Sequence, residues 1–266
     1  MSSVIKLSSP ATHEFWEIPV LFEDAHLLAL DKPAGLPVSP DRYDLDPARP
    51  TLLRLLHDAI AAGKPWAKER NLNYLTNAHR LEADTSGVLL LAKSKPVLVA
   101  LANLFSMEKP VQRYLALVHG TPVQDRFAVN ARLAPHPTSP AMIRVDPNGK
   151  KAETVFELVE KFASHTWLRC LPRAARPHQL RVHLQNSGLR IVGDELYGGK
   201  PLLLSRLKKD YRLKAGREER PLISRVALHA EQLELPHPIT GETVTITAPV
   251  PKELRVALKY LREFAA

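Results

Sequence analysis

Two short stretches of this chain gather side chains that can do chemistry. The first runs from His79 to Gly87 as His-Arg-Leu-Glu-Ala-Asp-Thr-Ser-Gly, directly before the apolar run Val88 to Ala92. An arginine, two carboxylates and two hydroxyls at the mouth of a strand form a loop that can present an acid to a substrate and hold it ionised. Composition alone favours a simpler interpretation, a salt-bridged turn.

The second stretch runs from Arg176 to Leu184 as Arg-Pro-His-Gln-Leu-Arg-Val-His-Leu, and we expect it at a strand start or a first helical turn. The spacing of His178 and His183 matches no established ligand pattern, and no cysteine or acid completes a set, so we predict no metal site. Ser86-Gly87 lacks the flanking glycine of a nucleophile elbow. These patterns leave acid-base or carboxylate chemistry as the main candidate.

Helices and strands around these stretches must position them. Apolar residues at helical spacing predict a helix from the cap residue Thr51 to Gly63, and a second from Pro96 to Glu108 that buries one face. That face is expected to hold Leu98, Leu101, Ala102 and Phe105. Val88 to Ala92 is too short for a helix and suits a buried strand.

Strands dominate the rest of the chain. His26 to Leu30 reads as a strand that ends at the Lys32 to Pro37 loop, where two prolines and a glycine break it. Beyond residue 110, alternating apolar and polar residues predict further strands at 114–118, 154–159 and 243–247. The first fifteen or so residues are polar and are expected to be a loose tail.

Composition narrows the class of protein. A chain of 266 residues, 45% of them hydrophobic, can bury a full core without disulfides, and its single cysteine, Cys170, lies in an apolar stretch that predicts a buried thiol in a reducing compartment. The amino-terminal sequence lacks the apolar stretch of a secretion signal, and no run approaches the length of a membrane helix. We therefore expect a cytoplasmic protein without membrane contact.

A net charge of +9 favours a polyanionic partner. The region from Lys200 to Arg220 is the most basic part of the chain. It fits a solvated helix or loop and an RNA-facing element equally well.

Several motifs together resemble one family. The segment HRLEADTSGVLLLAK is similar to the signature of RluA-type pseudouridine synthases, which usually reads His-Arg-Leu-Asp, two variable residues and Thr-Ser-Gly. The Lys32-Pro33-Ala34-Gly35 loop, the Arg113 to Val118 tyrosine motif and the His178 to Leu184 arginine motif follow in the family's order. The resemblance spans about residues 19 to 255, so we identify the chain as a member of this family.

The resemblance implies an α+β fold: a large, mainly antiparallel mixed sheet with flanking helices and a central cleft. We expect a tail over residues 1–18 and one catalytic domain over 19–266, with no room for the family's S4-type RNA-binding module. It also implies isomerisation of uridine to pseudouridine in structured ribosomal or transfer RNA, with no cofactor and no metal. We expect the protein to be a monomer.

The resemblance assigns roles to individual residues of this chain by their positions in the motifs. Glu82 stands where the family has its catalytic aspartate, and Asp84 occupies a variable place. Arg181 corresponds to the arginine that pairs with the catalytic carboxylate, and Tyr114 to the tyrosine that stacks on the uracil. The resemblance places a further group at the RNA, with Arg80 filling the gap left by the extruded nucleotide: His79, Arg80, Thr85, Arg176 and His178.

The glutamate leaves three explanations open. Glu82 serves as the carboxylate in a reshaped pocket, Asp84 has taken over through a shifted loop, or the protein binds RNA without modifying it. One extra methylene matters, because misplacement by about an ångström can cost on the order of a hundredfold in rate. Ala174-Ala175-Arg176-Pro177 also departs from the family's usual Thr-Gly-Arg-Thr. Two altered motifs that face one pocket indicate a divergent subgroup.

Overall fold

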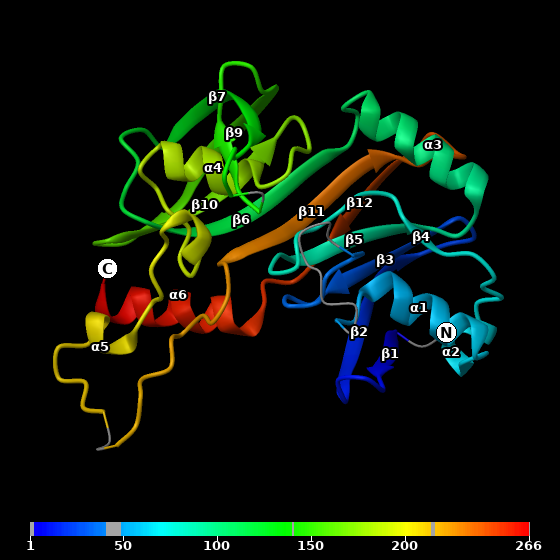
Figure 1. Cartoon of the computed structure of the whole chain (residues 1–266), viewed down its shortest axis with the longest axis horizontal. Coiled ribbons are helices and arrows are strands. Elements are labelled where there is room, and N and C mark those ends of the chain that lie inside the picture. The colour runs from blue at the N-terminus through cyan, green and yellow to red at the C-terminus, as the bar shows by residue number, and fades with distance from the viewer. Residues whose placement is uncertain (1–2, 41–48, 140, 214–215, 266) are drawn as a thin grey trace. The chain divides into compact units, whose positions relative to one another are not determined.

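The chain folds into two compact units, seen in a computed structural model that describes residues 3–40, 49–139, 141–213 and 216–265. Unit 1 comprises Met1–Gln112 and Ala230–Pro249, and unit 2 comprises Arg113–His229 and Val250–Ala266. The two units divide the span in which we predict a single domain. Each unit is built on β-strands with helices packed against them (Figure 1).

Unit 1 orders its strands β1-β2-β3-β5-β11, with β4 paired to β5 and β12 paired to β11. The pairs β1–β2, β2–β3, β3–β5, β4–β5 and β11–β12 are antiparallel. The bounds of these strands are β1 Val4–Ser9, β2 Glu14–Glu23, β3 Leu27–Lys32, β4 Thr76–Asn77, β5 Ser86–Ala92, β11 Leu228–Pro236 and β12 Thr243–Thr247.

The expectation of a loose amino-terminal tail is wrong for the described residues. Val4–Ser9 forms strand β1, which pairs along its whole length with β2. Ile5 and Leu7 are buried on alternate positions of β1, together with Ile18 of β2. Polar residues alternate with them, and this period-2 pattern marks a half-buried strand.

Three helices belong to unit 1: α1 Leu52–Ala61, α2 Pro65–Lys68 and α3 Lys95–Ser106. Both predicted helices are confirmed, and Thr51 is the N-cap residue of α1, although its side chain makes no capping hydrogen bond. The predicted face of α3 is partly wrong, since Ala102 is exposed and Val97 is buried in its place. Val97 and Leu101 pack with Leu27 of β3, Leu90 of β5 and other apolar residues.

Strand β5 is buried along its whole length, which confirms the prediction for Val88 to Ala92. Its neighbour β3 is buried at Leu27, Leu28, Ala29 and Leu30. Successive residues of a strand point to opposite faces, so both faces of this part of the sheet are covered. The loop that leads into β5 is therefore attached to a rigid part of the sheet.

Unit 2 orders its strands β6-β10-β9-β7-β8, and each neighbouring pair is antiparallel. The strands predicted at 114–118 and 154–159 are confirmed as β6 and β9. Burial alternates along β9, as predicted, but the alternation predicted for β6 is wrong, because Leu115 to Val118 are all buried. The bounds are β6 Val111–His119, β7 Arg126–Pro135, β8 Ile143–Val145, β9 Lys150–Lys161 and β10 His165–Pro172.

Unit 2 also holds α4 Gln179–Asn186, the 3-10 helix η1 Glu195–Tyr197, α5 Leu204–Leu207 and α6 Lys252–Phe264. Its core joins β6 and β10 to α4 and α6 through residues such as Leu117, Leu168, Leu184 and Leu258. Cys170 is fully buried in that core, as predicted, and desolvation raises the pKa of its thiol far above the ordinary value.

Candidate active site

The signature loop, residues 79–87, ends at the buried strand β5 in unit 1 (Figure 1). Its centre is a turn in which the Thr85 N–H donates to the Glu82 carbonyl at 3.1 Å. Glu82 is partly exposed and Asp84 is exposed, while Leu81 and Thr85 on either side are buried. Burial of the flanking residues fixes the backbone that carries both carboxylates.

A buried lysine ties this loop to the Lys-Pro-Ala-Gly loop. Lys32 is fully buried, and its ammonium donates to the carbonyls of Pro33 at 2.7 Å, Leu36 at 2.8 Å and Ala83 at 2.9 Å. The Gly35 N–H also donates to the Ala83 carbonyl, at 2.9 Å. Three carbonyl dipoles stabilise the buried charge, and two loops 50 residues apart in the chain are held together beside Glu82.

The surroundings of Gly87 explain why the signature ends in glycine. Its φ is +111°, and a Cβ at this position would lie 2.1 Å from the Ala230 carbonyl oxygen. No side chain fits there, because the backbone of β11 occupies the space. The glycine therefore permits the close approach of β5 and β11 at the point where the loop enters the sheet.

Of the residues expected at the RNA, those in unit 1 differ in exposure. His79 Nε2 accepts from the Leu90 N–H at 3.1 Å, and its ring stacks on Phe105 with the ring centroids 5.4 Å apart. Desolvation lowers the pKa of His79 to about 4, so the imidazole is neutral at pH 7. Thr85 is buried, and Arg80 alone of these three is exposed.

In unit 2 the arginine motif forms the start of helix α4. Of the two positions expected for it, a strand start or a first helical turn, the helical turn is confirmed. His178 precedes the helix in a left-handed conformation, with φ +51°. Gln179 fixes the turn: its Nε2 donates to the Glu153 carbonyl and to Thr154 Oγ1, both at 3.0 Å, and its Oε1 accepts from the Arg176 N–H at 3.1 Å. The helix is thereby joined to β9.

Arg181 lies on the buried face of α4 and forms a two-point ion pair with Asp194. Arg181 Nε donates to Asp194 Oδ2 at 2.8 Å, and Nη2 donates to Oδ1 at 2.5 Å. The guanidinium also lies over the Tyr197 ring, 4.9 Å from its centroid. Asp194 was not among the predicted site residues. It lies downstream of the arginine motif in the segment 193–199, Gly-Asp-Glu-Leu-Tyr-Gly-Gly, and an acid among glycines was a signal that could have found it.

Tyr197 links this ion pair to the start of the helix. Its hydroxyl lies 2.8 Å from His178 Nδ1 and accepts from the Ile143 N–H at 2.8 Å. Arg176 Nε donates to the Lys151 carbonyl at 3.2 Å. One buried or half-buried network of contacts thus joins four residues: His178, Arg181, Asp194 and Tyr197.

Tyr114 lies on β6 of unit 2, opposite Cys170 of β10, and packs half-buried against the core of that unit. The predicted site residues thus fall into two groups. The structure brings Glu82, Asp84 and their neighbours together in unit 1, and Arg181, His178 and Arg176 in unit 2. The pairing of Glu82 with Arg181 stays a prediction.

His183 of the second stretch has a structural environment. It is fully buried, its Nδ1 lies 3.0 Å from Thr154 Oγ1, and desolvation lowers its pKa to about 4. Within the described parts of the chain, no three His, Cys, Asp or Glu residues are placed to hold a metal ion. In those same parts, no helix is long and apolar enough to span a membrane.

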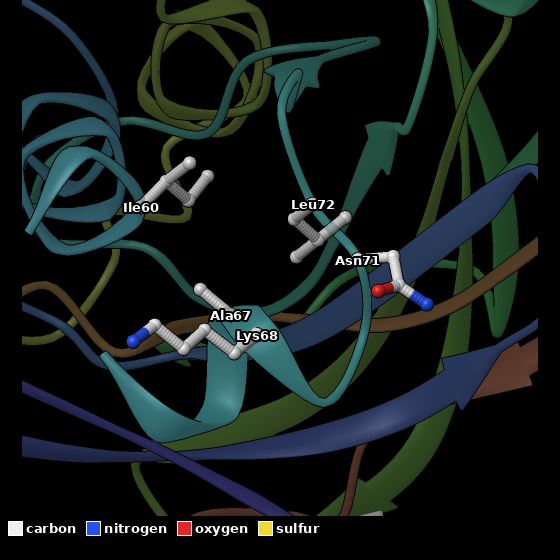
Figure 2. A pocket seen from close by; sticks show the side chains of 5 residues that line it. All are labelled: Ile60, Ala67, Lys68, Asn71 and Leu72. Atoms are coloured by element: carbon white, nitrogen blue, oxygen red, sulfur yellow. The ribbon is translucent and has the colours of Figure 1, made fainter. Parts of the chain in front are cut away.

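A depression of about 280 Å³ lies elsewhere in unit 1 and is lined by residues of α1, α2 and the segment that follows. Figure 2 shows Ile60, Ala67 and Leu72 around it, with Lys68 and Asn71 at its edge. It contains no carboxylate and no histidine. We therefore assign it no part in the chemistry of the signature loop.

Comparison with known proteins identifies the family. Residues 26–186 match the family model described as RNA pseudouridylate synthase. The chain is 36% identical over 263 residues to the ribosomal large subunit pseudouridine synthase D of Xanthomonas campestris, covering 99% of this chain and 75% of that protein. It is 35% identical to the ribosomal large subunit pseudouridine synthase C of Escherichia coli, covering 91% and 70%.

Solved structures agree on the fold. Human RNA pseudouridylate synthase domain containing 4 superposes with a TM-score of 0.68 at 22% identity, over 91% of this chain and 92% of that chain. The α+β class with mainly antiparallel strands, predicted from the motifs, is therefore confirmed. By its sequence relatives and its fold, the chain belongs to the RNA pseudouridylate synthase family.

Proposed function

We propose that this protein converts uridine to pseudouridine in structured ribosomal RNA, with Glu82 as the reacting carboxylate. The observation that carries the proposal is the signature loop itself, which holds an acid at position 82 between buried neighbours and a lysine-braced turn. The relatives named above are described as ribosomal large subunit synthases, which favours ribosomal over transfer RNA. They also favour an active enzyme over a protein that only binds RNA.

The reaction requires one nucleotide to leave its stack. A carboxylate cannot reach a sugar-base bond inside a helix, and extrusion of a nucleotide costs a few kcal/mol. Arg80 is exposed within the signature loop, where we propose that it fills the gap that the nucleotide leaves. In the proposed cycle the glycosidic bond breaks, the uracil turns, and its carbon 5 joins the ribose.

The proposal gives each site residue a part in the reaction. Glu82 attacks the sugar or the ring, or assists deprotonation, and then departs. Arg181 pairs with that carboxylate and orients it, while Asp194 and Tyr197 hold Arg181 in place. Tyr114 stacks on the uracil and is the candidate for removal of the carbon-5 proton. The remaining expectations are that the protein is a cytoplasmic monomer that needs no cofactor.

Release of tritium from ribosomal RNA labelled at uracil carbon 5 tests the proposal. The unmodified protein releases tritium, and Glu82→Gln, which keeps the shape and removes the charge, abolishes release. Glu82→Asp retains the acid but shortens its reach by about an ångström, so we expect a rate lower by on the order of a hundredfold. Asp84→Asn is the matched control and is expected to keep the rate near that of the unmodified protein, because the proposal gives Asp84 no part in the reaction.

The other outcomes have definite meanings. If Asp84→Asn abolishes release and Glu82→Gln does not, Asp84 is the reacting acid. If the unmodified protein binds ribosomal and transfer RNA yet releases no tritium from either, the isomerase proposal is wrong and the protein is an RNA-binding factor. Tyr114→Phe separates stacking from proton transfer, because it keeps the ring and removes the hydroxyl: we expect a lower kcat at an unchanged KM.

A further inference from the structure

In unit 2, the described residues 202–213 and 216–222 belong to one excursion of the chain whose two ends are held together. The Leu222 N–H donates to the Leu202 carbonyl at 2.8 Å, and the Ser205 N–H donates to Glu219 Oε1 at 2.8 Å. We call this segment the basic loop. In the described part of it, the short helix α5 is the only regular element. Loops longer than about 12–15 residues with little regular structure are uncommon in compact domains.

The base of the basic loop is anchored in the core. Leu202 is buried, and Leu207 and Leu222 pack against the main apolar cluster of unit 2. The ammonium of Lys208 lies over the Phe264 ring of α6, 5.4 Å from its centroid. Figure 1 shows the loop, in yellow to orange, leaving from α5 beside the red helix α6. The apolar anchors leave the polar side chains on the outside.

Positive charge is concentrated here. The 21 residues from Lys200 to Arg220 contain eight of the chain's 37 basic residues and three of its 28 acids, so they hold five of its nine net charges. The cations whose placement is described are all exposed: Arg206, Lys208, Lys209, Arg212, Arg217 and Arg220. Among the described residues, none of the six forms an ion pair with an acid.

Neighbouring residues extend this positive surface. His119 Nε2 lies 2.9 Å from the Lys200 carbonyl, and the ring is held at the base of the loop. Desolvation lowers the pKa of His119, and the charges of Lys200, Arg206 and Arg190 lower it further. Arg190 and Lys200 are both exposed. Repulsion among so many like charges is a cost that a polyanion removes when it binds.

We infer that the basic loop binds the phosphate backbone of the RNA substrate, independently of sequence and outside the nucleotide that reacts. This inference rests on the proposed function for the identity of the polyanion. RNA fits the surface because phosphates recur along each strand, and exposed Lys and Arg side chains release condensed counterions when they contact them. Long basic side chains on an anchored loop can follow a backbone without reading its bases.

Neutralisation of three loop cations tests the inference. The variant Lys209→Gln/Arg212→Gln/Arg217→Gln changes exposed side chains only, and Lys64→Gln/Lys95→Gln/Lys109→Gln removes the same charge from exposed positions of unit 1. The probe is a fluorescent RNA hairpin of about 20 base pairs, enough for two successive minor grooves. Both proteins carry Glu82→Gln as well, so that binding is measured without turnover.

The expected result is a dissociation constant at least about tenfold higher for the loop variant, and a log–log salt slope shallower by about two to three, since each lost phosphate contact removes roughly 0.9. The unit 1 variant is expected to keep most of the salt dependence that the parent protein shows. In tritium release with the intact Glu82, the loop variant raises KM and leaves kcat unchanged. Urea midpoints equal to that of the parent protein show that both triple variants fold.

Equal affinities and slopes for the two triple variants would overturn the inference, and the loop would then be a solvated surface that aids solubility. Failure of the isomerase proposal gives a different result. In that case no protein releases tritium, while the hairpin assay still separates the loop variant from its control. The two proposals therefore fail independently.

Discussion

Arg181 and Asp194 form a two-point ion pair that is almost fully removed from solvent, with side-chain exposures of 9% and 1%. The contact joins helix α4 to the start of η1, and the Tyr197 ring lies beneath the guanidinium. A planar fork that meets a carboxylate at two points fixes direction as well as charge. The arginine that the family motif assigns to catalysis is therefore oriented within unit 2 itself.

Removal of one partner of this pair is expected to cost more than removal of both. Asp194→Asn or Arg181→Met leaves a buried charge without its partner and lowers the free energy of unfolding by about 3–5 kcal/mol. The double variant Arg181→Met/Asp194→Leu recovers part of that loss, because no buried charge is left. Urea unfolding of the three variants measures the difference, with the exposed Asp210→Asn as control. Additive losses would show that the pair is not coupled.

Gly87 and Gly35 both have positive φ, but only Gly87 is sterically confined. A Cβ at Gly87 meets the backbone of Ala230, whereas nothing lies within 4 Å of a Cβ at Gly35. We expect Gly35→Ala to cost about 1–2 kcal/mol, the cost of left-handed backbone alone. Gly87→Ala is expected to exceed about 4 kcal/mol, because β5 and β11 must move apart. Equal urea midpoints for the two variants would contradict the close approach.

Lys32 is expected to couple two loops. Lys32→Met removes the ammonium that the carbonyls of Pro33, Leu36 and Ala83 share, and we expect a loss of about 3 kcal/mol or more, since each buried acceptor left unsatisfied costs about 1–3 kcal/mol. Hydrogen exchange gives the sharper measurement. The Gly35 amide, which donates to Ala83, should lose protection together with the amide of Thr85.

The control for this experiment is Lys95→Met, which changes an exposed lysine at the start of α3. It should leave the exchange of both amides unchanged. Loss of protection at only one of the two loops in Lys32→Met would show that the lysine braces that loop alone.

Buried histidines predict a loss of stability in acid. Desolvation lowers the pKa of His183 to about 4, below its ordinary 6.5, so the unfolded chain binds more protons between these values. Stability is therefore full above pH 6.5 and falls as the pH drops toward 4, by at most about 1.4 kcal/mol per pH unit for one histidine. His79 and His165 have pKa values of about 4 for the same main reason and add to the slope.

His183→Asn is expected to make the fall between pH 6.5 and 4 shallower, measured by urea unfolding at several pH values. His13→Asn is the control, since His13 is exposed and its left-handed backbone suits asparagine. A slope that is the same in both variants would show that folding does not lower the pKa of His183. His79→Gln provides a second test on the signature loop.

Local sequence patterns were enough to predict most of the helices and strands. Helices α1 and α3, strands β5 and β6 and the alternating strands β9 and β12 follow from hydrophobic period and from glycine and proline at their ends. The predictions that were wrong depended on burial by distant segments. Strand β1 was predicted as a tail because only its pairing with β2 makes its short period-2 pattern meaningful, and Ala102 of α3 is exposed because the packing face turns toward Val97.

The sequence by itself determined the family, the order of the motifs and which side chains are candidates for chemistry, because these depend on residue type and spacing. The tertiary structure alone decided that Asp194 orients Arg181, that Lys32 braces the turn after Glu82, and that the cations of the basic loop face outward from an apolar anchor. Such contacts join residues far apart in the chain. Their geometry comes from packing and from the satisfaction of buried polar groups, which no local pattern encodes.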